Sequence, residues 1–230
     1  MTLEFHFNEG GPFVKKHIVC FGDSNTHGFC TDPNDCMEHG DRFNEEERWT
    51  HLLQKALGED YLVLEEGLSG RTTVFPDPLH ECMPGLDVIY SCLMSHEPVD
   101  LLVIMLGTND TKERFGANAA CIGLGMERLV MKAKTVPAWR NGKPNILVIA
   151  PPHIGEGLYT HVFGPTMGKG CPEKSRELAP FYAEVAERQG CTFLDAEGVA
   201  EFNQVDYMHL TAKGHAQLAA KLAELVPTLV

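Results

Sequence analysis

The sequence lacks any apolar run long enough to cross a membrane as a helix. The longest such run in the 230 residues covers positions 101–106, far below the roughly 20 residues that a membrane-spanning helix needs. The first positions carry Glu4, His6 and Lys15, whereas a signal peptide needs an uninterrupted apolar segment there. We therefore expect a cytoplasmic protein without a membrane partner.

Basic residues are also scarce. The chain has 19 Lys and Arg against 32 Asp and Glu, a net charge of -13. Proteins hold nucleic acid largely through Lys and Arg at the phosphates, so this charge argues against a nucleic-acid partner. The eight cysteines include no C-x-x-C pair, and Cys20 and Cys92 lie in apolar runs, as small buried side chains do. Neither a disulfide framework nor a structural zinc site is expected.

Two kinds of ligand-binding motif are missing. No G-x-G-x-x-G or G-x-x-x-x-G-K-[ST] motif follows a predicted strand, and no H-E-x-x-H motif occurs. The first absence disfavours a flavodoxin-like module that binds a nucleotide or phosphate, and the second disfavours a metal-dependent hydrolase. Both stay open as alternatives. We expect no cofactor and no metal.

Five short apolar runs alternate with segments of helical periodicity. The runs predict buried strands and cover residues 17–21, 61–64, 101–106, 146–149 and 191–194. Helices are expected at 48–57, 117–133, 173–189 and after Thr211. This alternation predicts an α/β protein, a three-layer α/β/α sandwich with a five-stranded parallel sheet. The length suits a single domain, residues 17–230, after an N-terminal arm, residues 1–16.

Two segments interrupt this regular pattern. Pro180 is expected to kink the third helix or to mark its true start, because proline lacks the backbone N–H that a helix interior needs. Residues 153–172 are rich in Gly and lack periodicity. They predict a long loop of the kind that covers a site, and we expect this loop and the one at 30–43 to shape a pocket.

Polar residues follow several strands at the point where each strand ends. Ser24 comes just after the first strand, Gly70 after the second and Asn109 after the third, while residues 206–209 follow the fifth. The carboxyl ends of parallel strands lie along one edge of the sheet, where ligands bind in open α/β folds. Taken singly, the segments around Ser24 and Gly70 would also suit ordinary turns, and Asn109 would suit the N-cap of a helix.

Four short blocks, in this order along the chain, carry a family resemblance. Residues 22–24 with Gly28, then 67–70, 107–110 and 206–209 resemble the signature blocks of the SGNH (GDSL) hydrolases. The flavodoxin-like fold of that superfamily agrees with the predicted sheet. A closer similarity to its arylesterase and acyltransferase branch rests on residues 48–50, 65–73 and 106–112.

The resemblance implies a site in which Ser24 is the nucleophile, His209 the general base and Asp206 the group that orients the imidazole. It also implies an oxyanion hole made of the Ser24 and Gly70 backbone N–H groups and the Asn109 side-chain amide. These roles meet the needs of ester cleavage, which are a nucleophile, a base and donors for the developing negative charge. Asp23 and Arg71 are interpreted as scaffold residues.

The choice of histidine does not follow from spacing. An Asp precedes a His by three residues twice, at 77–80 and at 206–209, and both segments are expected near the same edge of the sheet. The resemblance favours the second pair, because the family's D-x-x-H block lies just before the last helix.

By resemblance, the substrates are small acyl esters, acetyl or aryl, including esters of carbohydrates. The chain departs from the family pattern at Asn25 and His27, where relatives tend to have an aliphatic and an aromatic residue. If these side chains line the acyl pocket, the pocket is more polar than in relatives, which weakens the alternative of an acyltransferase, a reaction that depends on excluding water. A homo-oligomer is expected, because close relatives are often oligomers.

Overall fold

A five-stranded parallel sheet forms the centre of the structure, a computed structural model that describes residues 14–230. All four neighbouring strand pairs are parallel, and the order β2-β1-β3-β4-β5 is that of flavodoxin-like sheets. The strands are Lys16–Gly22 (β1), Tyr61–Gly67 (β2), Leu101–Met105 (β3), Ile146–Ala150 (β4) and Thr192–Asp195 (β5). The predicted α/β class and sheet are confirmed.

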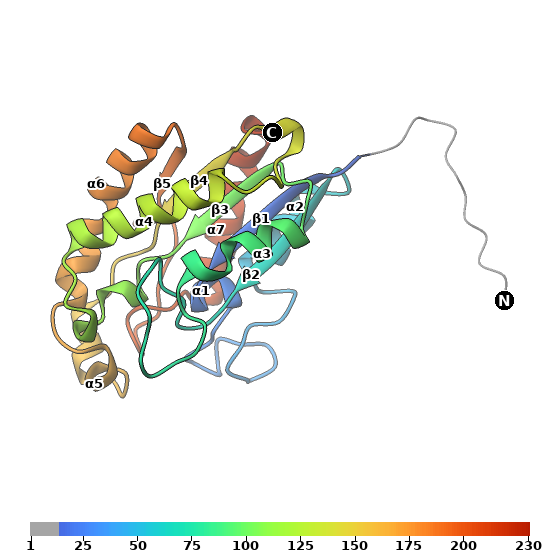
Figure 1. The fold of residues 1–230 in the computed structure, drawn as a ribbon. Coiled ribbons are helices and arrows are strands. Elements are labelled where there is room, and N and C mark those ends of the chain that lie inside the picture. Colours follow the sequence, from blue (N-terminus) through green and yellow to red (C-terminus); the bar gives the residue numbers. More distant parts are fainter. Residues whose placement is uncertain (1–13) are drawn as a thin grey trace.

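Helices cover both faces of the sheet (Figure 1). The main ones are Trp49–Leu57 (α2), Gly85–Ser95 (α3), Ala119–Lys134 (α4), Cys171–Gln189 (α6) and Ala212–Leu225 (α7). Helices α3, α4 and α6 pack on one face, and α2 and α7 pack on the other. The result is the predicted three-layer sandwich.

Alternation along the strands explains why both faces are covered. On β1, Val19 and Phe21 belong to the core beneath α3, α4 and α6, whereas Ile18 and Cys20 belong to the core beneath α2 and α7. Side chains of a strand point alternately to its two faces. A strand that is apolar at every position therefore requires a helical layer on each side.

Helix α3 was not predicted. Its sequence carries a helical apolar pattern, with Leu86, Ile89 and Leu93 spaced by three and four residues, and Ile89 and Leu93 are fully buried. The helix follows Pro84, whose backbone is extended. The signal was present, but it is short and follows a stretch rich in proline and polar residues.

Helix α6 excludes one of the two outcomes expected at Pro180, that the proline marks its start. The helix runs without a break from Cys171 to Gln189, so the proline neither ends it nor marks its start. Proline removes one hydrogen bond of the helix ladder, and the buried residues Leu178 and Tyr182 on either side hold the helix against the sheet core. The 153–172 segment also contains more helix than predicted, including α5 (Gly164–Met167).

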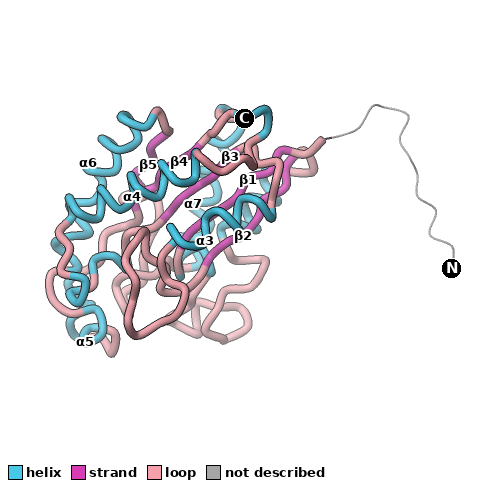
Figure 2. The backbone as a smooth tube through the Cα atoms, in the orientation of Figure 1, coloured by secondary structure: helices cyan, strands magenta, loops and turns pink. Residues whose placement is uncertain are grey.

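Long loops gather at the edge of the sheet where the strands end (Figure 2). A four-residue helix, α1 (Ser24–His27), follows β1 directly at this edge. The predicted arm lies outside the described residues except for its last three positions, and β1 already begins at Lys16. The single domain over 17–230 stays a prediction. Within residues 14–230, no helix is long and apolar enough to span a membrane.

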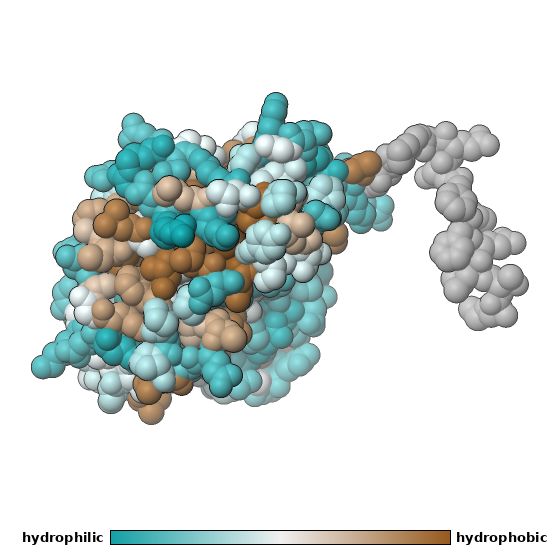
Figure 3. Space-filling view, in the orientation of Figure 1, coloured by the Kyte–Doolittle hydropathy of each residue, from teal (hydrophilic) through white to brown (hydrophobic). Residues whose placement is uncertain are grey.

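The face formed by α3 and α4 has an apolar centre. Figure 3 shows apolar residues gathered over the middle of this face. Large side chains exposed on these two helices include Tyr90, Leu124 and Met131. Apolar patches on a protein surface are often sites of association. The predicted homo-oligomer stays a prediction.

Candidate active site

Ser24 lies at the carboxyl end of β1, as its position in the sequence predicts. Asp23 caps α1, because its side chain accepts a hydrogen bond from the backbone N–H of Asn25 at 3.0 Å. The turn is tight. A Cβ on Gly22 would lie 2.0 Å from the Thr26 hydroxyl, and Gly28 ends α1 with φ of 84°. Together these residues present the Ser24 side chain at the edge of the sheet.

His209 meets Ser24 across 185 residues of sequence. Its Nε2 lies 2.8 Å from the Ser24 Oγ, and its Nδ1 lies 2.5 Å from the Asp206 Oδ2. The other carboxylate oxygen of Asp206 accepts hydrogen bonds from the backbone N–H groups of Met208 and His209. Residues 206–209 therefore form a single turn that is closed by the Asp206 carboxylate. Ser24, His209 and Asp206 form a continuous hydrogen-bonded chain.

Asp206 is completely buried and fully hydrogen-bonded. It accepts hydrogen bonds from the Thr31 hydroxyl and from the Asn203 side-chain amide, the latter at 2.9 Å. Burial alone raises the pKa of this carboxyl, but the hydrogen bonds from His209 and Thr31 outweigh burial and hold the pKa below its usual range. The side chain is therefore ionised next to the imidazole.

Gly70 and Asn109 line the same cavity as Ser24. Gly70 has φ of 92°, a backbone conformation that favours glycine. The Asn109 amide donates one hydrogen bond to the backbone oxygen of Arg71 at 3.2 Å. A side-chain amide carries two N–H donors, so this contact orients the Asn109 side chain and leaves the second hydrogen for another acceptor.

Buried charges support the loops around the cavity. Arg71 donates hydrogen bonds to the backbone oxygens of Gly22 and Glu66 and stacks 4.2 Å from the centre of the Phe21 ring. Asp110 accepts hydrogen bonds from the backbone and hydroxyl of Thr73. Burial raises the pKa of Asp110 to about 6. The hydrogen bonds of Arg71 to Gly22 and Glu66 tie β1 and β2 to the loop that carries Gly70, which is the scaffold role predicted for Arg71.

The second Asp-to-His pair occupies another part of the cavity wall. His80 lines the cavity, and its Nδ1 lies 3.3 Å from Asp77. Asp77 also forms ion pairs with Lys112 at 3.0 Å and with Arg114 at 2.7 Å. Among the described residues, the Ser24 hydroxyl forms its hydrogen bond with His209. The geometry therefore joins Ser24 to the 206–209 pair.

The cavity in front of Ser24 has a volume of about 390 Å³. Phe29, Phe163, Met167 and Met208 supply its apolar wall. The segment 153–172 contributes to this wall, as predicted. The loop at 30–43 does not contribute to the lining within the described part of the chain, and its Thr31 contacts Asp206 instead.

The cavity lining does not meet the condition stated for Asn25 and His27. Asn25 and His27 are not among the described residues that line it, so they do not make an acyl pocket polar. Asn25 is buried and bonds the chain on both sides of His209. Its Nδ2 donates to the Met208 oxygen at 3.2 Å, and its Oδ1 accepts from the Leu210 N–H at 2.9 Å. An asparagine suits this position because it can donate and accept at once.

Three residues of the site were missed by sequence reasoning. Thr31 and Asn203 bond Asp206, and Asn25 positions the His209 segment. Thr31 and Asn203 are ordinary polar loop residues, and no spacing rule connects them to Asp206. Asn25 did stand out as a departure from the family pattern, which was the one available signal.

Comparisons with known proteins define the class of protein. The family model of the GDSL-like lipase/acylhydrolase family matches residues 20–217. The chain belongs to this family of SGNH hydrolases and is a carboxylic ester hydrolase. A search of proteins with curated functions found no match.

Solved structures agree with the family assignment. An aryl esterase from M. smegmatis is 37% identical, with a TM-score of 0.84, over 94% of this chain and 100% of that one. A carbohydrate acetylesterase from Sinorhizobium meliloti is 34% identical, with a TM-score of 0.84, over 94% and 100%. A lipase/acylhydrolase from Enterococcus faecalis, 20% identical with a TM-score of 0.67 over 93% and 96%, shares the fold.

Proposed function

We propose that the protein hydrolyses small acyl esters through an acyl-enzyme formed on Ser24. The observation that carries this proposal is the unbroken chain of contacts from the Ser24 hydroxyl to His209 and from His209 to the buried Asp206. A serine hydroxyl is a weak nucleophile until an adjacent base accepts its proton, and that base works best when a third group orients it.

In the acylation step, the Ser24 Oγ attacks the ester carbonyl carbon while its proton passes to the His209 Nε2. The negative charge then develops on the carbonyl oxygen. The backbone N–H groups of Ser24 and Gly70 and the second amide hydrogen of Asn109 donate to that oxygen. Asp206 stabilises the imidazolium, whose Nδ1 it contacts at 2.5 Å. The ester bond breaks, and the alcohol leaves with the proton from His209.

In the deacylation step, a water molecule attacks the acyl-enzyme. His209 accepts a proton from the water, the same three donors stabilise the second oxyanion, and Ser24 departs with the proton that His209 returns. Acid and free serine are the products. His209 and Asp206 therefore serve both halves of the reaction.

The proposed substrates are acetyl and aryl esters, including acetyl esters of carbohydrates. A cavity of about 390 Å³ with an apolar wall suits a small acyl group and a ring-sized leaving group. Two relatives point the same way, an aryl esterase and a carbohydrate acetylesterase. No specific observation favours acyl transfer over hydrolysis.

Mass spectrometry of the acyl-enzyme tests this function. The protein is mixed with p-nitrophenyl acetate, quenched in acid during turnover and digested. We expect one acetyl group on the peptide that contains Ser24. Acetylation of another residue at the rate of turnover, with none on Ser24, would contradict the mechanism. Light scattering on the untreated native protein checks the predicted homo-oligomer.

A further inference from the structure

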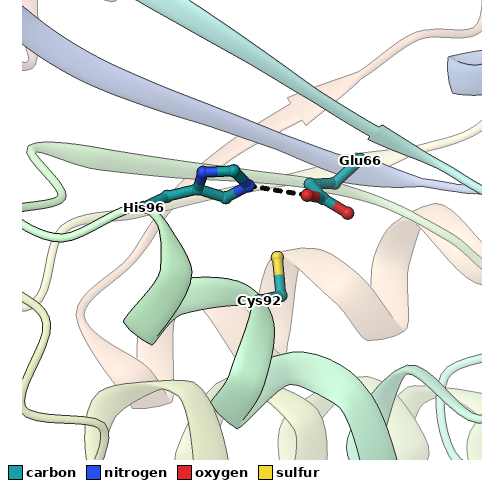
Figure 4. A group of neighbouring side chains, drawn as sticks. All are labelled: Glu66, Cys92 and His96. Carbon is teal, nitrogen blue, oxygen red and sulfur yellow. Dashed lines mark hydrogen bonds and ion pairs between the residues drawn. The ribbon is translucent and has the colours of Figure 1, made fainter.

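A second cluster of chemically reactive side chains lies at the edge of the sheet, outside the cavity that contains Ser24. Glu66 at the end of β2, Cys92 on α3 and His96 at the C-terminal cap of α3 face one another (Figure 4). Each offers one ligand atom, and these atoms all lie within 4.8 Å of one another. The cluster joins a carboxylate, a thiol and an imidazole from two elements.

We propose that Glu66, Cys92 and His96 bind a zinc-type divalent cation, with water as the fourth ligand. Sulfur, nitrogen and carboxylate oxygen are the donors that zinc takes in proteins, and three protein ligands plus water complete a tetrahedron. This donor set disfavours Mg²⁺ and Ca²⁺, which prefer oxygen ligands alone. Coordination by Cys92 breaks its S–H bond and releases that proton to solvent.

The three ligand atoms lie within 4.8 Å of one another and must shift to reach coordination geometry. The His96 Nε2 and the Glu66 Oε1 are 2.6 Å apart, and bond lengths of about 2 Å to a tetrahedral zinc place two such atoms about 3.3 Å apart. The Glu66 oxygen must therefore move away from the His96 nitrogen by less than 1 Å. The Cys92 sulfur must move toward both of them. The Glu66 and His96 side chains are 32% and 22% exposed, so both have room to adjust.

The helix end and the two acidic ligands offset the charge of a divalent cation, whereas the Arg71 guanidinium in the same cavity opposes it. His96 caps the C-terminus of α3, where the last carbonyl groups of a helix give a partial negative charge. A thiolate and a carboxylate neutralise a divalent ion. Arg71 lines the same surface cavity, of about 250 Å³, and its buried Nε has no hydrogen-bond partner among the described residues. That N–H is a ready donor to an anionic ligand of the metal.

No metal was expected from the sequence, in which the three residues of this cluster lie in two separate segments. Cys92 on α3 and His96 at its C-terminal cap lie four residues apart, on one side of the helix end. Helix α3 was not predicted. Glu66 lies in a different segment that was assigned only to the family motif. Only the packing of α3 beside the end of β2 brings the three residues together.

Cobalt titration tests the site, because Co²⁺ replaces zinc and reports a thiolate ligand by a sulfur-to-metal charge-transfer band. We expect the whole protein to develop this band and to lose it when Zn²⁺ is added. Cys92→Ser should abolish the band. His96→Gln and Glu66→Gln should each weaken cobalt binding by about a hundredfold or more. The loss of a residue that only orients a ligand already weakens metal binding by about 10- to 100-fold.

Matched controls separate this site from adventitious binding. Cys82 and Cys121 are exposed thiols, and Cys82→Ser and Cys121→Ser should keep the band unchanged. Zinc at a hundredfold excess over its Kd should also raise the Tm of the parent by about 5–10 °C and leave the Tm of His96→Gln unchanged. No band with cobalt in excess, or a band that survives Cys92→Ser, would overturn the proposal.

Discussion

The Nε2 of His209 lies 2.8 Å from the Oγ of Ser24, although 185 residues separate them. Two features of the fold create this contact. Ser24 begins the short helix after β1, and His209 lies in the turn just before α7, so both reach the carboxyl edge of the sheet. Asn25, the neighbour of Ser24, then bonds the backbone on both sides of His209.

Removing the Asn109 amide should slow turnover. Asn109→Ala deletes one proposed oxyanion donor, and we expect kcat to fall by about 10²–10³ with a small change in KM, because the lost interaction belongs to the transition state. Asn34→Ala, in an exposed loop, is the matched control and should keep the parental kcat. Steady-state hydrolysis of p-nitrophenyl acetate measures both. A parental kcat in Asn109→Ala would remove this residue from the oxyanion hole.

Asn25 is expected to act by positioning His209. Asn25→Leu removes the two hydrogen bonds to Met208 and Leu210, which together contribute about 1–3 kcal/mol. We expect a lower free energy of unfolding and a lower kcat in this variant, measured by urea denaturation and ester hydrolysis. A variant that loses stability but keeps the parental kcat would show that Asn25 is structural only.

The Thr31 hydroxyl should support catalysis by stabilising the ionised Asp206 carboxylate. Thr31→Val keeps the shape of the side chain and removes the hydrogen bond to the carboxylate. The loss of about 0.5–1.5 kcal/mol corresponds to a kcat about two- to tenfold lower. Thr160→Val, at an exposed threonine, should not change kcat. Equal kcat values for Thr31→Val and the parent would mean that the Thr31 hydroxyl does not assist Asp206 and His209 in catalysis.

A buried histidine should make the fold sensitive to acid. Burial, and next the charge of Arg48, lower the pKa of His215 to about 3, and its Nδ1 accepts a hydrogen bond from the Trp49 N–H at 3.2 Å. Between pH 6.5 and about 3 the unfolded chain takes up a proton at this histidine, whereas the folded chain does not. The free energy of unfolding therefore falls as the pH falls through this window.

Gln in place of His215 removes this titration and keeps an acceptor for Trp49. Relative to His215→Gln, the parent should lose about 2 kcal/mol of stability between neutral pH and about pH 5. Urea denaturation of both proteins at the two pH values measures this change in the free energy of unfolding. The contributions of groups that titrate in both proteins cancel in the comparison. The same loss in both proteins would contradict the lowered pKa of His215.

The sequence predicted the sheet well because its evidence is local. Runs such as 101–105 are apolar at every position, and Figure 1 shows the resulting strands covered on both faces. Helix α3 was missed because its pattern is short. A helix start at Pro180, one of the two outcomes expected there, was wrong because tertiary packing of Leu178 and Tyr182 outweighs one lost hydrogen bond.

The site was predictable to the extent that it lies in short motifs. Ser24, Gly70, Asn109, Asp206 and His209 all lie in the four blocks, and the structure brings all five to one edge of the sheet. The contacts of Thr31 and Asn203 with Asp206, and the cluster of Glu66 with Cys92 and His96, arise from side chains that meet only after folding. No spacing in the chain encodes those contacts.

The most direct test of the proposed mechanism compares Ser24→Ala, His209→Ala and His80→Ala with the parent in p-nitrophenyl acetate hydrolysis, with a chelator present. His80 lies in the same cavity and next to Asp77, so it is the matched control for His209. We expect activity to fall by about 10⁴ or more in the Ser24 and His209 variants and to persist in His80→Ala. Parental activity in Ser24→Ala would contradict the account.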